Sequence, residues 1–168
     1  ASADLAHVRC RALRLPNRAT EIVVSIIRFH RSFPALEAVA ASRRSIYRYF
    51  QETGSVGVAV VWFSLGRLLA SVDRRIERER WSVALDAVRK VLRAYFDHYD
   101  EIVAPEPMLD GHDLIELGLE PGPSLGQVHD RLLELQAAGE IHCRDEAIRY
   151  VQRRYLTDEI REVGSTDD

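Results

Sequence analysis

The spacing of the apolar residues is the feature that most constrains the fold of this chain. Apolar side chains recur at intervals of three and four along nearly its whole length, which is the period of an amphipathic helix. No window alternates between apolar and polar residues as a half-buried strand does. We therefore predict an all-α fold, a multi-helix bundle with a small C-terminal helical subdomain, and 168 residues suffice to bury a core.

Helix start and stop signals divide the first part of the chain. We expect Asn17 to cap the second helix and Ser42 to cap a helix that ends before Gly54. We expect the apolar helix at 56–72 to be buried nearly all round, and Phe96 to lie on the apolar face of the last helix. The apolar face of the first helix consists of Leu5, Val8, Ala12 and Leu15. The predicted helices span residues 3–14, 18–30, 34–41, 43–53, 56–72 and 81–102.

A proline-rich linker, "VAPEPMLDG", separates this part from a compact C-terminal unit. We place the boundary between two regions, 1–104 and 105–168. In the second region we expect Asp110 to cap a short helix and Gly118 to end it with a positive φ. Pro123 is expected at the first position of the next helix, because its missing N–H is not needed there.

The stretch "LGLEPGPSLGQ", residues 117–127, has two interpretations. Glycines next to a helix N-terminus can seat a phosphate, because they let backbone N–H groups approach an anion closely. The same residues can form a tight turn between two helices. Three nearby carboxylates, those of Glu116, Glu120 and Asp130, would repel a phosphate, so we favour the turn.

Composition excludes several classes of protein. Apolar residues make up 46% of the chain and charged residues 29%, which is typical of a globular protein and not of a disordered or membrane-spanning one. Two distant cysteines, Cys10 and Cys143, fit a reducing cytosol, so we expect a cytoplasmic protein with no membrane partner. The sequence does not begin with Met, and we expect it to be a fragment of a longer protein.

The formal net charge of -3 conceals an uneven distribution. Arginines outnumber carboxylates before residue 55, whereas carboxylates dominate between Asp97 and Glu146. We therefore expect one end of the molecule to be basic and the other acidic. The early arginines are Arg9, Arg11, Arg14, Arg18, Arg28, Arg31, Arg43, Arg44 and Arg48.

No short motif of a catalytic or nucleotide-binding site occurs in the sequence. The dipeptide His112-Asp113 would need a further His and Asp around a metal, so we interpret Asp113 as a carboxylate that stabilises N–H groups at a helix start. We interpret His30, at a helix end, as a capping or packed histidine. No residue is assigned a catalytic or metal-binding role.

The segment "SRRSIYRYF" holds the candidate binding residues. Arg44 and Arg48 are four apart and share a helix face, Arg43 is adjacent, and Tyr47 lies between them. Guanidinium groups bind phosphates in a fork, and a tyrosine ring can stack on a base. The alternative is that the aromatic residues belong to the core and the arginines to a solvated face.

Three segments resemble the C-terminal region of bacterial tRNA nucleotidyltransferases and poly(A) polymerases that carry a His-Asp (HD) domain. They are "CRALRLPNRATEIVVSIIRFH", "SRRSIYRYFQETG" and "MLDGHDLIELGLEPGPSLGQVHDRLLELQAAGEIHCRDEAIRYV". The third is the most specific, because its glycine, proline and apolar residues are in register with the family pattern. The chain departs from that pattern at Gly66-Arg67, where such proteins often read Ala-Asp.

The resemblance implies an all-helical body and tail that position the acceptor end of a tRNA while a separate head adds nucleotides. Residues 1–104 would be the end of an HD-like region and the RNA-binding body, and 105–168 the tail. Mg²⁺, ATP and CTP would belong to the catalytic head, which is not contained in these residues. The residues implied to contact RNA are Arg43, Arg44, Tyr47 and Arg48.

Two other functions stay open at the level of sequence. One is a helical cap of an HD-type metal-dependent phosphohydrolase that acts on nucleotides. The other is a structural module that forms a homodimer. The sequence also leaves open whether a parent protein adds CCA, a single A or poly(A).

Overall fold

A computed structural model describes residues 2–33, 41–70 and 78–156. These residues form helices and turns without a strand, which confirms the all-α prediction. The helix expected at 34–41 falls, apart from Ala41, outside the described residues. The helices are α1 (Ser2–Ala12), α2 (Asn17–Phe29), α4 (Arg43–Thr53), α5 (Gly57–Ala70), α6 (Arg78–Asp97), α7 (Gly111–Glu116), α8 (Pro123–Ala138) and α9 (Arg144–Val151). A 3₁₀ turn spans Gly54–Val56, and π-helical turns span Tyr99–Val103 and Gln152–Leu156.

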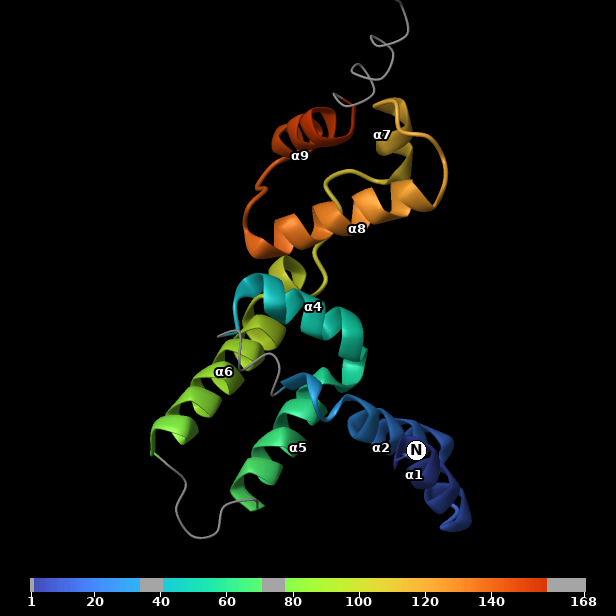
Figure 1. Cartoon of the computed structure of the whole chain (residues 1–168), viewed down its shortest axis with the longest axis vertical. Helices are drawn as coiled ribbons and strands as arrows, with labels where there is room; N and C mark the ends of the chain where they lie inside the picture. The colour runs from blue at the N-terminus through green and yellow to red at the C-terminus, as the bar shows by residue number, and fades with distance from the viewer. Residues whose placement is uncertain (1, 34–40, 71–77, 157–168) are drawn as a thin grey trace, which may run out of the picture.

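The helices form an elongated molecule (Figure 1). The tail unit of α7, α8 and α9 lies at one end, and α8 packs on α4. α5 and α6 extend from α4 away from the tail, and α1 and α2 form a hairpin that contacts the rest through α2. α4 therefore lies at the centre, where body and tail meet.

Local signals place the ends of α4 where the sequence predicts them. The hydroxyl of Ser42 accepts a hydrogen bond from the backbone N–H of Ser45 at 3.2 Å. Gly54 ends the helix with a φ of 56°, a conformation that costs glycine little. The cap predicted at Asn17 is wrong: Asn17 is already helical, and its side-chain oxygen accepts a hydrogen bond from Arg11 at 3.1 Å.

One hydrophobic core holds the body together. α4, α5, α6 and the Tyr99–Val103 turn supply most of it, and the Tyr49 hydroxyl donates a hydrogen bond to the carbonyl of Gly57 at 2.7 Å. That bond ties the start of α5 to α4. The buried members are Phe33, Ala41, Ile46, Tyr49, Phe50, Val60, Val61, Ala87, Val88, Val91, Ala94, Ile102 and Val103.

A second core lies in the tail. Its buried members are Leu109, Leu114, Val128, Leu132, Leu135, Ile141, Ala147 and Val151. The linker between the two cores is pinned to α8, because Gln136 donates to the carbonyl of Glu106 at 3.0 Å and accepts from the N–H of Met108 at 3.2 Å. Val103 is the last buried member of the body core along the chain, and Leu109 is the first buried member of the tail core.

Several apolar side chains that were expected to be buried are exposed. Leu5 on α1 is 72% exposed, Trp62 on α5 is 55% exposed, and Phe96 on α6 is 69% exposed. The prediction that residues 56–72 are buried nearly all round is wrong for α5, because its neighbours cover only the side that carries Val60 and Val61. Helical spacing shows which residues share a face, but packing decides whether that face is covered.

One helical stretch in the described part of the chain, Arg43–Ala70, is long and apolar enough to cross a membrane by length and composition alone. Its most apolar window has a mean hydropathy of 1.4, and 28% of that window is buried. A helix in the core of a protein passes the same test. This stretch supplies Ile46, Tyr49, Phe50, Val60 and Val61 to the body core.

Candidate nucleic-acid interface

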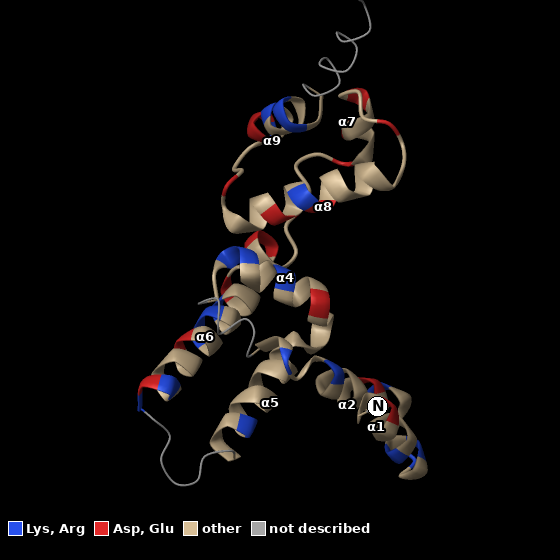
Figure 2. Ribbon diagram, in the orientation of Figure 1, with Lys and Arg blue, Asp and Glu red and all other residues tan. Residues whose placement is uncertain are grey.

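The four predicted RNA-binding residues lie on α4 where it meets the tail. Helical spacing places Arg44, Tyr47 and Arg48 on one side of α4, and Arg43 begins the helix. Figure 2 shows basic positions of α4 next to acidic positions of α8 and of the turn after α6. The structure therefore brings these residues together, but against other parts of the same chain.

Glu134 on α8 is the centre of the ionic contacts. Its carboxylate oxygen lies 3.0 Å from Arg44 Nε, 2.7 Å from an Arg48 nitrogen and 3.2 Å from an Arg131 nitrogen. Its side chain is 13% exposed. Arg44 also contacts Glu140 at 2.8 Å. The Arg44 contacts lack the angles of aligned hydrogen bonds although their distances are short, so they act as close charge pairs.

Arg43 caps the C-terminal end of α8. Its Nε donates a hydrogen bond to the carbonyl of Ala137 at 3.0 Å, and its terminal nitrogen lies 3.4 Å from Glu101. The last carbonyls of a helix have no partner within the helix and carry partial negative charge, so a guanidinium stabilises them. We call the ionic contacts of Arg43, Arg44 and Arg48 with Glu101, Glu134 and Glu140 the α4–α8 clamp.

Tyr47 is buried between α4 and α8. It is 6% exposed, so its ring faces are covered by the protein. Burial raises the pKa of the Tyr47 hydroxyl above its usual value, and the carboxylates of Asp130 and Glu134 raise it further. A base could stack on this ring only if α4 and α8 separated. RNA contact by Arg43, Arg44, Tyr47 and Arg48 stays a prediction, and each of them has a role inside the chain.

The basic and acidic ends noted in the sequence meet in the α4–α8 clamp. That charge asymmetry was the signal that could have indicated internal pairing. Sequence reasoning did not predict the contact of Arg131 with Glu134, the carboxylate that also binds Arg44 and Arg48.

His112-Asp113 serves as a helix start, as interpreted from the sequence. Asp110 accepts hydrogen bonds from the N–H groups of His112 and Asp113, and Asp113 accepts one from the N–H of Asp110 at 2.9 Å. Asp113 also binds Arg144 on α9, at 3.1 Å for one nitrogen–oxygen pair. The Arg144 guanidinium is the main reason that the pKa of Asp113 is lowered to about 2.

The described residues contain no group of three His, Cys, Asp or Glu side chains placed to hold a metal ion. The Nδ1–H of His30 donates a 2.6 Å hydrogen bond to the carbonyl of Ile27, in keeping with a capping histidine at the end of α2.

The stretch 117–127 forms a tight turn and helix start. Gly118 has a φ of 107°, and the N–H of Leu119 donates back to the carbonyl of Leu114 at 3.1 Å. Pro123 begins α8 as predicted. Leu119 and Leu125 pack on the tail core, so the stretch fixes the packing of α7 against α8.

Comparison with known proteins finds similarity to tRNA nucleotidyltransferases. The chain is 27% identical over 146 residues to a CC-adding tRNA nucleotidyltransferase of Thermus thermophilus, an alignment that covers 86% of this chain and 30% of the relative. It is 40% identical over 68 residues to an A-adding tRNA nucleotidyltransferase of Deinococcus radiodurans, covering 40% of this chain and 15% of the relative.

The chain thus resembles part of the tRNA nucleotidyltransferase family and spans 30% or less of the length of these relatives. No family model matches it. No solved structure matches it either.

Proposed function

We propose that this chain is a tRNA-binding region of a tRNA nucleotidyltransferase or poly(A) polymerase-like protein, which positions the acceptor end for nucleotide addition by a separate catalytic domain. The observation that carries the proposal is the alignment with the CC-adding enzyme over 86% of the chain. An elongated, all-helical region suits this role, because it can follow a long ligand over several helices.

In this proposal the catalytic domain of the parent protein, and not this chain, carries out nucleotide addition. By the family resemblance, Mg²⁺, ATP and CTP would be bound by the catalytic domain of the parent protein. This chain would supply affinity and orientation, through contacts of cationic side chains with the RNA backbone. A cytoplasmic location is part of the same proposal.

Fluorescence anisotropy with a labelled tRNA transcript tests the proposal. We expect binding at low salt that weakens as a power of the salt concentration, because bound cationic side chains release counterions from the RNA. A DNA hairpin of similar charge is the control, and we expect it to bind more weakly because it lacks the A-form shape and the 2′-hydroxyl groups. Absence of tRNA binding even at about 50 mM salt would contradict the proposal.

A further inference from the structure

The aromatic ring of Phe96 is exposed and belongs to neither hydrophobic core. It is 69% exposed on α6, although the sequence placed it on an apolar face. The residues that α6 buries are Ala84, Ala87, Val88, Val91 and Ala94, on the opposite side of the helix. The body core therefore does not account for a large apolar side chain at this position.

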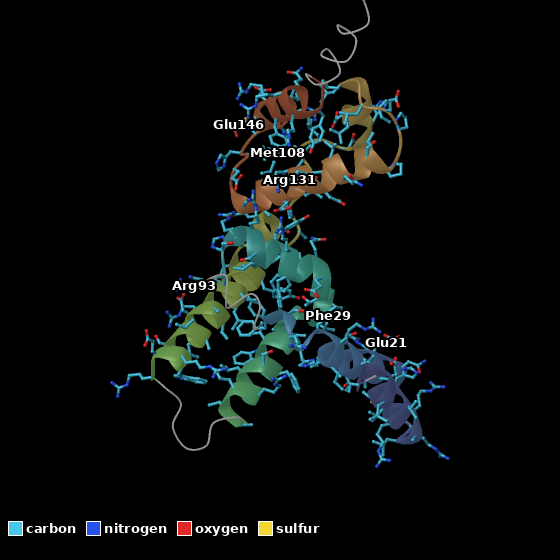
Figure 3. The ribbon with its side chains drawn as sticks, in the orientation of Figure 1. Glu21, Phe29, Arg93, Met108, Arg131 and Glu146 are labelled. Atoms are coloured by element: carbon cyan, nitrogen blue, oxygen red, sulfur yellow. The ribbon has the colours of Figure 1, made fainter. Side chains whose placement is uncertain are left out.

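Two arginines share the exposed side of α6 with Phe96. Arg89, Arg93 and Phe96 follow each other at intervals of four and three, so they form one line about 10 Å long on the helix surface. Figure 3 draws Arg93 on the side of α6 that faces away from α5. Both arginines are exposed, and within the described ranges neither has an ion-pair partner.

Carboxylates border this line on both sides. Asp86, the carboxylate before Arg89, is held by Lys90 at 2.8 Å, and the charge of Arg89 also helps to lower the pKa of Asp86, after the larger effect of Lys90. Asp100 is exposed next to Tyr99. Asp97 is exposed next to Phe96 and borders one edge of the line. The arginines are available to an external anion, in contrast to the guanidinium groups of the α4–α8 clamp.

The ring of Phe96 is held in place from the core. It meets the ring of Tyr95 edge-on at 5.1 Å, and Tyr95 in turn contacts Phe50 of the body core at 5.3 Å. Tyr99, which is 44% exposed, also meets the ring of Tyr95 edge-on, at 5.4 Å. Two exposed rings are therefore anchored by a third one that is packed on the core, so little conformational freedom is lost when a ligand stacks on them.

The surroundings of Phe96 favour nucleic acid over protein as the ligand. A protein-docking surface is a contiguous apolar patch, whereas the exposed neighbours of Phe96 on α6 are Arg89, Lys90, Arg93 and Asp97. Exposed rings interleaved with arginines are the arrangement by which proteins bind unpaired nucleotides, with stacking on the bases and cations on the backbone.

We propose that the α6 outer face, defined as Arg89, Arg93, Phe96 and Tyr99, binds RNA where a duplex gives way to a single strand. Arg89 and Arg93 bind backbone phosphates, and Phe96, flanked by Tyr99, stacks on an unpaired base. This inference rests on the proposed function and assigns the RNA contact to residues outside the α4–α8 clamp.

The test compares two RNA probes by fluorescence anisotropy with the 168-residue chain. One probe is a short RNA hairpin, and the other is the same hairpin with a few unpaired nucleotides at its 3′ end. We expect Arg89→Ala/Arg93→Ala to weaken both and to reduce the salt slope by about 1.4 to 2, since two phosphate contacts are lost. We expect Phe96→Ala to weaken only the extended probe, by about 5- to 150-fold, which is the contribution of one stacked base.

Two matched control variants remove an exposed side chain of the same kind at positions outside the proposed site. Arg149→Ala removes an exposed arginine of α9, and Leu69→Ala removes an exposed apolar side chain of α5. We expect both to bind the two probes as the unchanged chain does. Circular dichroism and light scattering on each variant check that fold and size are retained.

The outcomes separate this site from the proposed function. If the unchanged chain binds neither tRNA nor the probes, the proposed function fails and the site with it. If the unchanged chain binds RNA but the α6 variants bind equally well, only the site is overturned. A change of oligomeric state in Phe96→Ala without any change in RNA affinity also overturns the site, because the face is then a protein interface.

Discussion

At the scale of single residues, two glycines of α5 have different reasons to be there. A Cβ atom at Gly57 would lie 2.7 Å from the Thr53 hydroxyl oxygen and 2.8 Å from the Phe50 ring, so glycine lets α5 approach α4. A Cβ atom at Gly66 would meet nothing within 4 Å. Space requires glycine at the first position and not at the second.

Replacement of each glycine by alanine should therefore have opposite effects. We expect Gly57→Ala to lower the free energy of unfolding by about 1–3 kcal/mol through overpacking. We expect Gly66→Ala to raise it by about 0.5–1 kcal/mol, because alanine loses less backbone entropy in a helix. Urea denaturation followed by circular dichroism measures both. Equal effects of the two changes would contradict the packing of α5 on α4.

At the scale of elements, one ion pair joins α7 to α9. Asp113 holds the first turn of α7 and binds Arg144 of α9, and the Arg144 nitrogen also donates to the carbonyl of Met108 at 3.0 Å. Arg144 thus connects α9 to α7 through Asp113 and to the linker through the Met108 carbonyl. Protonation of Asp113 would weaken its hydrogen bond at the start of α7 and its ion pair with Arg144.

The tail should consequently lose stability in acid. The pKa of Asp113 is about 2 in the folded chain, below its ordinary value of 3.8. Its contribution is therefore fully present above about pH 4 and is lost as the pH falls towards 2. We expect Asp113→Asn to lower the melting temperature at pH 7 and to flatten its decrease between pH 4 and pH 2. Glu120→Gln, at an exposed carboxylate of the same unit, should leave the pH profile unchanged.

At the scale of the whole molecule, the α4–α8 clamp sets how the tail sits on the body. Three guanidinium groups, those of Arg44, Arg48 and Arg131, contact Glu134. Glu134 is on α8, which packs in the tail core, whereas Arg44 and Arg48 are on α4, which packs in the body core. Removal of the Glu134 charge would leave like charges facing each other across the junction. This carboxylate, the Arg43 hydrogen bond to Ala137, the buried Tyr47 and the pinned linker all lie at the junction of the two cores.

Glu134→Gln should loosen the junction. We expect the free energy of unfolding to fall by about 1–3 kcal/mol, less than for a fully buried pair because the arginines are partly exposed. We also expect faster proteolysis of the linker at 104–110. If Arg44 and Arg48 contact RNA, the freed guanidinium groups should raise RNA affinity, and Arg44→Ala/Arg48→Ala should lower it.

Glu140→Gln is the matched comparison within the clamp, at a more exposed carboxylate than Glu134. The Glu140 side chain is 54% exposed, and its ion pair with Arg44 lies at 2.8 Å, so loss of its charge should change stability by less than about 1 kcal/mol. If Glu134→Gln and Glu140→Gln have the same small effect, the junction is held by apolar packing and the linker instead of by the clamp.

The sequence by itself determined the helices, because their signals act between near neighbours. Ser42 and Gly54 bound α4 as predicted, and Pro123 begins α8, since a hydroxyl cap, a positive φ and a missing N–H need no distant partner. The resemblance to tRNA nucleotidyltransferases also came from the residues alone, and the similarity to two such enzymes supports it.

Only the tertiary structure decided what the faces of those helices meet. Phe96 and Trp62 lie at core-like spacing but are exposed, because burial depends on which helices pack together. Arg44 and Arg48 looked like free cations, yet they bind Glu134 from a distant part of the chain. Ion pairs and burial depend on residues that are far apart in the sequence. Local patterns therefore predicted the helices but not which helices and side chains contact each other.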